Sequence, residues 1–180
     1  RVIKKLDFGI YLDGGDLGEI LMPAKWIIGN IEINDELEVF VYYDSEDRPI
    51  ATTMKPRAHV GEISSLTVKE ITDVGAFLDW GLQKDLLVPF REQKERMQQG
   101  RAYPVYVYLD VRTKRIAASA KIEKFLDIEK ISYQEGDEVD LIIWGKTDLG
   151  FKAIINHKHQ GMLYNNEIFQ ELEIGQVLKG

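Results

Sequence analysis

The sequence predicts an all-β protein built from tandem five-stranded β-barrels with short helical turns, the third barrel being incomplete. Three observations support this prediction. The chain of 180 residues repeats itself, each repeat contains short strand-like segments separated by Gly, Pro and Asp, and one repeat has about the length of a small barrel.

A shift of 66 positions, without a gap, places the first part of the chain on the second. The segment Gly9–Asp13, Gly-Ile-Tyr-Leu-Asp, returns as Gly75–Asp79, Gly-Ala-Phe-Leu-Asp. The match continues through three further pairs of segments: Glu19–Pro23 with Asp85–Pro89, Val39–Asp44 with Val105–Asp110, and Ile50–Lys55 with Ile116–Lys121. Chance would not keep one offset across so many positions.

A weaker third copy begins at a shift of 75, where Thr147–Gly150 repeats Thr72–Gly75. One extra residue is expected after it, so that Met162 and Leu163 take the places of residues 86 and 87. We therefore expect barrels at 1–57, 58–135 and 136–180. The first strand of the first barrel is expected to be truncated and the last two strands of the third to be missing, as in a fragment of a longer protein.

The second copy shows the expected elements most clearly. Its strands are predicted by alternating apolar and polar residues or by β-branched and aromatic residues; they are Glu62–Glu70, Gly75–Asp79, Asp85–Val88, Tyr103–Leu109 and Arg115–Ser119. Pro89 ends the third strand because it cannot donate a ladder hydrogen bond. Residues 91–99 are good helix formers followed by Gly100, which predicts a short helix.

Five strands with a helical turn between the third and fourth are the plan of an OB-type barrel. The second and third strands of such a barrel form an exposed face, flanked by loops, on which members of this fold bind oligonucleotides. OB barrels also serve as protein-interaction modules, so the fold alone does not decide the function.

The run Val74–Asp79, followed by Asp85–Pro89 and closed by Arg115–Lys121, resembles the S1 RNA-binding domain. With Tyr103–Asp110 and Gly150–Phe169, the three copies resemble the conserved virulence factor B family, bacterial regulators with three such domains and a C-terminal winged helix. The resemblance implies contact with single-stranded RNA through aromatic residues on the second strand and a His on the third. It also implies an Asp and a basic residue around the last turn.

Carried over by position, the resemblance assigns RNA binding to nine residues: Phe8, Tyr11, Asp44 and Arg48 in the first copy, Phe77, Asp110, Lys114 and Arg115 in the second, and Tyr164 in the third. The position of the His is expected at Met22, Val88 and Tyr164, none of which is a His. Aromatic rings hold unstacked bases of any identity, so little sequence preference is expected. The alternative is that these rings belong to the core, since aromatic residues in strands more often pack than bind.

The composition limits the function further. A formal charge of -7 opposes the coating of duplex nucleic acid through phosphate contacts alone. The middle copy, with 12 basic and 12 acidic residues, is repelled least by phosphate. The absence of cysteine excludes disulfides and thiolate metal sites. Since no apolar run approaches the roughly 20 residues that cross a bilayer, a cytoplasmic protein without membrane contact is expected.

Catalysis is not predicted, because the sequence contains no phosphate-cradling loop, nucleophile motif or paired carboxylates tied to a His. No cofactor, metal or small-molecule ligand is expected, and His157 and His159 lack a third metal ligand. Trp80 is expected to be the most exposed tryptophan. We expect an RNA-binding regulator and not an enzyme. The rival interpretation is a protein-interaction scaffold that docks onto ribosome or RNA polymerase components.

Overall fold

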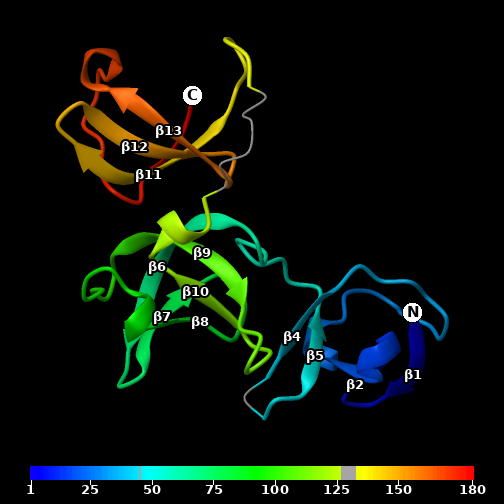
Figure 1. Ribbon diagram of the computed structural model, residues 1–180. Helices are drawn as coiled ribbons and strands as arrows, with labels where there is room; N and C mark the ends of the chain where they lie inside the picture. Colours follow the sequence, from blue (N-terminus) through cyan, green and yellow to red (C-terminus); the bar gives the residue numbers. More distant parts are fainter. Residues whose placement is uncertain (45, 127–132) are drawn as a thin grey trace. The chain divides into compact units, whose positions relative to one another are not determined.

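The computed structural model describes residues 1–44, 46–126 and 133–180, and its regular elements in these ranges are strands and single 3-10 turns (Figure 1). The chain forms two compact units, Arg1–Pro56 with Gly81–Lys84 and Arg57–Trp80 with Asp85–Gly180. In the described ranges, no helix has the length and apolar character that crossing a membrane requires. The predicted all-β class is confirmed.

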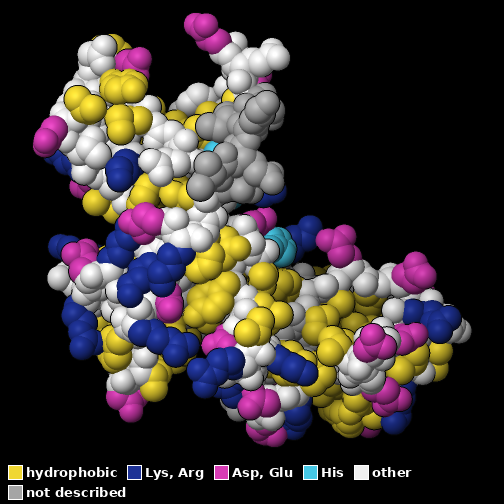
Figure 2. All heavy atoms as spheres, in the orientation of Figure 1, with side chains coloured by type: hydrophobic (Ala, Val, Ile, Leu, Met, Phe, Trp, Pro, Cys, Tyr) yellow, Lys and Arg dark blue, Asp and Glu magenta, His cyan; other side chains and the backbone are white. Residues whose placement is uncertain are grey.

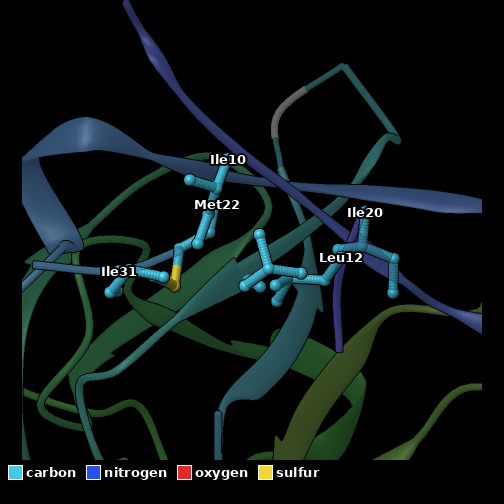
Figure 3. Packing of buried hydrophobic residues seen from close by; sticks show 7 residues of the cluster. Ile10, Leu12, Ile20, Met22 and Ile31 are labelled. Carbon is cyan, nitrogen blue, oxygen red and sulfur yellow. The ribbon is translucent and has the colours of Figure 1, made fainter. Parts of the chain in front are cut away.

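The first barrel contains five strands in the order β1-β2-β3-β5-β4. Their bounds are β1 Val2–Leu6, β2 Gly9–Asp13, β3 Glu19–Pro23, β4 Phe40–Tyr43 and β5 Pro49–Thr52, with 3-10 turns η1 at Gly15–Leu17 and η2 at Ala24–Trp26. Alternate residues of β2 and β3 point inward, as the two-residue period of a strand requires. Figure 3 shows the resulting core, in which Ile10 and Leu12 meet Ile20, Met22 and Ile31.

The second barrel is a sheet with the order β10-β9-β6-β7-β8. Its strands are β6 Ile63–Ile71, β7 Gly75–Asp79, β8 Leu86–Pro89, β9 Ala102–Leu109 and β10 Ile116–Ser119, with turns η3 at Phe90–Glu92 and η4 at Ile122–Lys124. Near the ends of β8 and β10, the N–H of Ala120 donates to the carbonyl oxygen of Glu92 at 2.9 Å. The Ser119 hydroxyl donates to the Glu92 carboxylate at 2.7 Å. These bonds tie the two ends of the sheet together.

The third sheet has four strands in the order β13-β12-β11-β14. They are β11 Asp140–Thr147, β12 Gly150–Ile155, β13 His159–Tyr164 and β14 Val177–Lys179, with turn η5 at Asn165–Glu167. Within the second unit, β11 and β12 share a buried cluster with the second barrel, made of Ile63, Ile122, Ile142, Trp144 and Ile154. The third sheet is therefore packed as part of that unit.

One glycine per copy shows that the three copies share one backbone plan. Gly9, Gly75 and Gly150 have φ values of 156°, 155° and 153°. A Cβ at each would collide with the carbonyl oxygen of the strand alongside, on Met22, Val88 and Leu163 respectively. The offset of 75 thus persists from Gly150 to Leu163, and the expected extra residue before Met162 is wrong.

The five strands predicted in the second copy are confirmed, with Gly75–Asp79 matched at both ends and the others to within one residue. The helix predicted over 91–99 is wrong, since only the turn Phe90–Glu92 forms there. The buried Gln93 side chain donates to the carbonyl oxygen of Val88 at 3.1 Å and accepts from the N–H of Met97 at 3.3 Å. Met97 is buried too, so tertiary contacts hold this segment in an irregular path.

The expected exposure of Trp80 is also wrong, because only 3% of this residue is accessible to solvent. It directly follows β7, and its carbonyl oxygen accepts a 2.7 Å hydrogen bond from the N–H of Arg57. Burying a large apolar ring at the end of a strand stabilises a small barrel more than a solvent-exposed ring would.

Candidate nucleic-acid interface

Two aromatic rings and a lysine lie together on the outer face of the first barrel. Tyr11 points outward because Ile10 and Leu12 on either side of it are buried. Phe8 is 58% exposed and meets Tyr11 edge to face, with ring centroids 6.4 Å apart and an interplanar angle of 86°. Lys4 pairs with Tyr11 across β1 and β2, and its Nζ lies 5.3 Å from the Tyr11 ring centroid. Phe8 is thus exposed and Tyr11 partly exposed, and Lys4 lies beside the Tyr11 ring.

Asp44 builds the turn between β4 and β5 that carries Arg48. Asp44 Oδ1 accepts hydrogen bonds from the N–H groups of Glu46 at 2.8 Å and Arg48 at 3.0 Å. Its Oδ2 accepts from Arg48 Nε at 3.0 Å and Nη2 at 2.8 Å. Partial burial acts to raise the pKa of Asp44, but the hydrogen bonds from Arg48 and Glu46 outweigh it and lower that pKa. Asp44 is therefore ionised at neutral pH, and its carboxylate holds the Arg48 guanidinium in place.

The turn and the rings belong to one face of the sheet. Tyr11 pairs with Leu21 across β2 and β3, and Leu21 pairs with Ile50 across β3 and β5. Arg48 precedes Ile50 by two residues. The hydrogen bond with Asp44 is the largest cause that raises the pKa of Arg48, and the nearby Tyr11 contributes in the same direction. Phe8, Tyr11, Asp44 and Arg48, all predicted from the sequence, are thus neighbours.

The first barrel has aromatic residues at two positions, Phe8 and Tyr11, and the second barrel keeps only the one equivalent to Tyr11. Phe77 lies on β7 opposite Leu87 of β8, between the buried Ala76 and Leu78, and its ring is half-buried. Val74 occupies the position of Phe8 and is 52% exposed. Phe77 and Tyr11 therefore point out of their barrels, which rules out the interpretation of both as core residues.

Asp110 builds the turn between β9 and β10 in the same way as Asp44. Its Oδ1 accepts from the N–H groups of Arg112 at 2.9 Å and Thr113 at 3.3 Å, and these bonds are the largest causes that lower its pKa. Its Oδ2 lies 3.8 Å from Nη2 of Arg91, which follows β8. The predicted Lys114 and Arg115 are both exposed in this turn.

Tyr108 links Arg91 to the outer end of β9. Burial is the largest cause that raises the pKa of this phenol, followed by the charges of Glu92 and Asp110, while Arg91 acts in the opposite direction. Tyr108 therefore stays neutral and able to donate a hydrogen bond at neutral pH. Arg91 was not predicted as a site residue, and only the folding of η3 against β9 brings it to Asp110.

Tyr164 ends β13 and is 49% exposed. It pairs with Gly150, whereas Gly75 and Gly9 pair with Pro89 and Pro23. The residues equivalent to Tyr164 are thus the two prolines, and the assignment of Met22 and Val88 to this position is wrong. Both of those side chains are fully buried in their cores.

The two histidines of the third sheet have structural contacts. His157 Nδ1 lies within hydrogen-bonding distance of the carbonyl oxygen of Ile63, and His159 meets the ring of Tyr133 edge to face at 5.5 Å. In residues 1–44, 46–126 and 133–180, no group of three His, Cys, Asp or Glu side chains is placed to hold a metal ion.

Lys4 is a second residue that the sequence reasoning missed. Its place beside Tyr11 follows from the register of the β1–β2 hairpin, in which Leu6 pairs with Gly9. Counting back from that tight turn pairs Lys5 with Ile10 and Lys4 with Tyr11, and the irregularity between Val2 and Lys4 begins only beyond this pair.

Two small five-stranded sheets of OB type, each with an outward aromatic residue on the second strand and an Asp-built turn carrying cations, define a class of oligonucleotide-binding barrels. The S1 domain family matches residues 1–54 and 60–121, and the chain belongs to this family. Two relatives are similar to it. The uncharacterized protein YitL of Bacillus subtilis (strain 168) is 39% identical over 83 residues, which are 46% of this chain and 28% of YitL.

The second relative is a crystal structure described as a multidomain protein with nucleic acid binding domains from Streptococcus pneumoniae TIGR4. It matches with a TM-score of 0.58 and 19% identity over 99% of this chain and 65% of that one. This similarity supports the fold. The chain thus spans 28% of the length of YitL and 65% of the pneumococcal chain.

Proposed function

We propose that this chain binds single-stranded RNA with little sequence preference and acts by binding, without catalysing a reaction. The observation that carries the proposal is the outer face at β2, where the exposed Phe8 and the partly exposed Tyr11 lie beside Lys4 and Arg48. An exposed ring stacks on any unpaired base, contributing roughly 1–3 kcal/mol per base. Adjacent cations attract the phosphates on either side of that base.

Membership of the S1 domain family supports this proposal, as does the description of the pneumococcal relative as having nucleic acid binding domains. Lys and Arg side chains also gather over the second barrel in Figure 2, although the whole chain carries a charge of -7. We further propose that the protein belongs with the conserved virulence factor B regulators and works in the bacterial cytoplasm, where its RNA ligand would be found.

Affinity for RNA is expected to be modest for each barrel. One or two stacked bases supply a few kcal/mol, which alone gives dissociation constants near the millimolar range. A strand that occupies two barrels gains from the raised effective concentration of the second site. Because phosphate contacts release counterions, the affinity should fall steeply as salt increases.

Fluorescence anisotropy with a labelled, unstructured RNA tests the proposal on the 180-residue chain. Replacing Phe8→Ala together with Tyr11→Ala should weaken binding by about ten-fold or more, since two stacking surfaces are lost. Phe169→Ala is the matched control, because this ring is 94% exposed but lies outside the first two barrels, in the segment between η5 and β14. Equal affinity of the wild-type and Phe8/Tyr11 chains would contradict the site.

The variant Phe77→Ala with Arg115→Ala tests the second barrel in the same assay and should also weaken binding. The rival function is a scaffold that docks onto ribosome or RNA polymerase components, which the acidic net charge favours. It predicts no RNA binding by the wild-type chain at any salt concentration.

A further inference from the structure

The residue just before the second strand and the residue just after the third are neighbours in each copy, and in each of the first two barrels one of the two is a phenylalanine. After each third strand, a backbone N–H donates to a carbonyl oxygen just before the second strand. The pairs are Ala24 to Phe8 at 2.9 Å, Phe90 to Val74 at 3.4 Å and Asn165 to Leu149 at 3.0 Å. The two residues of each pair are therefore neighbours at equivalent places in the three copies. The first barrel has Phe beside Ala, whereas the second has Val beside Phe.

The ring that replaces Phe8 carries its own cation. The guanidinium carbon of Arg96 lies 4.0 Å from the centroid of the Phe90 ring, well inside the range of a cation–π contact. With offsets of 66 and 75, the residues equivalent to Arg96 are Asn30 and Glu171. The combination of ring and guanidinium thus occurs in the second barrel, where Val74 has taken the place of the strand aromatic residue.

The chain between these two residues is anchored to the barrel. Gln93 and Met97 are buried, and the Gln93 side chain is bonded to Val88 and to the N–H of Met97. Arg96 directly precedes Met97. These anchors hold Arg96 near Phe90 in the absence of a helix, so less conformational entropy is lost when a ligand binds there.

The charge of Arg96 is available to a ligand. In the parts of the chain that the structure describes, Arg96 forms no ion pair with a carboxylate, while the neighbouring Lys94 is paired with Glu123. Arg96 is exposed. A guanidinium lying on a ring has a second face, and planar guanidinium groups stack on unpaired bases. Such a group supplies a stacking surface and a phosphate-attracting charge at the same place.

We propose that Phe90 and Arg96 together form an RNA-contact position of the second barrel, taking the role that Phe8 has in the first. Arg96 stacks on an unpaired base with its outer face, and Phe90 supports the guanidinium from below. This inference rests on the proposed RNA binding, and it assigns the stacking contact to the segment after β8 instead of to position 74.

The test measures the affinity of the 180-residue chain for a labelled, unstructured RNA at two salt concentrations. Arg96→Ala and Phe90→Leu should each weaken binding about five-fold or more. Arg96→Lys keeps the positive charge but loses the planar guanidinium that stacks on a base. It should therefore weaken binding nearly as much as Arg96→Ala, while keeping the salt dependence of the wild type. Arg101→Ala is the matched control, since Arg101 is an exposed arginine of the same barrel.

A second design moves the ring back to the strand. The variant Phe90→Ala with Val74→Phe recreates the pair found in the first barrel, and it should bind more tightly than Phe90→Ala alone. Circular dichroism confirms that each variant keeps its sheet content. Full affinity of Arg96→Lys, or an equal loss in Arg101→Ala, would show that charge alone acts and would overturn the inference.

Failure of the inference differs from failure of the proposed function. If the wild-type chain binds RNA and the Phe8/Tyr11 variant is weakened while Arg96→Ala is not, the inference is wrong and RNA binding stands. If the wild-type chain does not bind RNA, both are wrong.

Discussion

The first and second barrels build the same turn but obtain its cation from different places. In both, Oδ1 of an Asp accepts two backbone N–H groups and shapes the hairpin between the last two strands. Oδ2 of Asp44 holds Arg48 of its own turn at 2.8 Å. Oδ2 of Asp110 faces Arg91 from the segment after β8 at 3.8 Å. The turn-building role of the Asp is thus constant between repeats, whereas the source of the cation is not.

The difference shows why a site cannot be carried between repeats by position alone. A hydrogen bond to the local backbone depends on the Asp and on backbone N–H groups two to four residues after it, and the repeat preserves the Asp. A contact with an arginine from another element depends on the path of a loop, which can change without altering any strand.

The largest expected effect concerns the glycine at the start of the second strand, which both barrels share. Gly75→Ala and Gly9→Ala would each place a Cβ against a backbone carbonyl of the neighbouring strand. Since backbone cannot move aside as a side chain can, we expect a loss of about 3 kcal/mol in the free energy of unfolding for each. Urea denaturation followed by intrinsic fluorescence measures this loss.

The control for the glycine prediction is Gly100→Ala. Gly100 has φ +81° but open space around the position of a Cβ. It should cost only about 1 kcal/mol, from backbone strain alone. An equal effect of all three substitutions would contradict the shared close approach of the strands.

Stability at low pH should depend on the two turn carboxylates. The pKa values of Asp44 and Asp110 are lowered in the folded protein. Such groups stabilise the fold above their unfolded pKa, near 3.9, and this contribution is lost as the pH falls through the lower folded value. The chain should therefore become easier to unfold by urea below about pH 4.

Asp44→Asn with Asp110→Asn sharpens this prediction, because an amide oxygen can still accept the backbone bonds but does not titrate. The double variant should show a flatter dependence of stability on pH between about 5 and 3. An unchanged slope would mean that other carboxylates dominate the acid response.

The smallest expected effect is a change in the pKa of the turn carboxylate when its arginine is removed, and this change should differ between the two barrels. Arg48→Ala should raise the pKa of Asp44 toward its ordinary value, since Arg48 supplies hydrogen bonds and charge to that carboxylate. Arg91→Ala should change the pKa of Asp110 less, because the largest causes there are the N–H groups of Arg112 and Thr113. Titration of the carboxyl carbons by NMR measures both, and a larger shift at Asp110 would contradict the comparison.

The strands were predicted well from the sequence because a strand is indicated by residues close together in the chain, either alternating apolar and polar residues or short apolar runs bounded by turn residues. The segment Gly75–Asp79 was placed correctly, since Gly75 and Asp79 bound a short apolar run with an aromatic residue at its centre. Residues 91–99 were misassigned because helix propensity is a weak preference that tertiary contacts override. Here the burial of Gln93 and Met97 decides the path of the chain.

The residues of the candidate site were also predicted only in part. Phe8, Tyr11, Asp44 and Arg48 were assigned by position from the resemblance to the S1 domain. They are neighbours because the sheet register joins Tyr11 to Leu21 and Leu21 to Ile50. Tyr164 lies at the end of its strand, and its equivalents in the other copies are the prolines that pair with Gly9 and Gly75, not Met22 and Val88.

The amino-acid sequence was enough to predict the all-β class, the repeat offset of 66 and the start of a third copy at an offset of 75, because strand period and glycine spacing are local properties. That Tyr11 and Phe77 point outward follows from the burial of their neighbours in the folded barrels. Only the tertiary structure decided that Arg91 faces Asp110 and that Arg96 lies on Phe90. Both arginines belong to an irregular segment whose course is set by which distant side chains it buries, and no periodic pattern in a sequence records such a course.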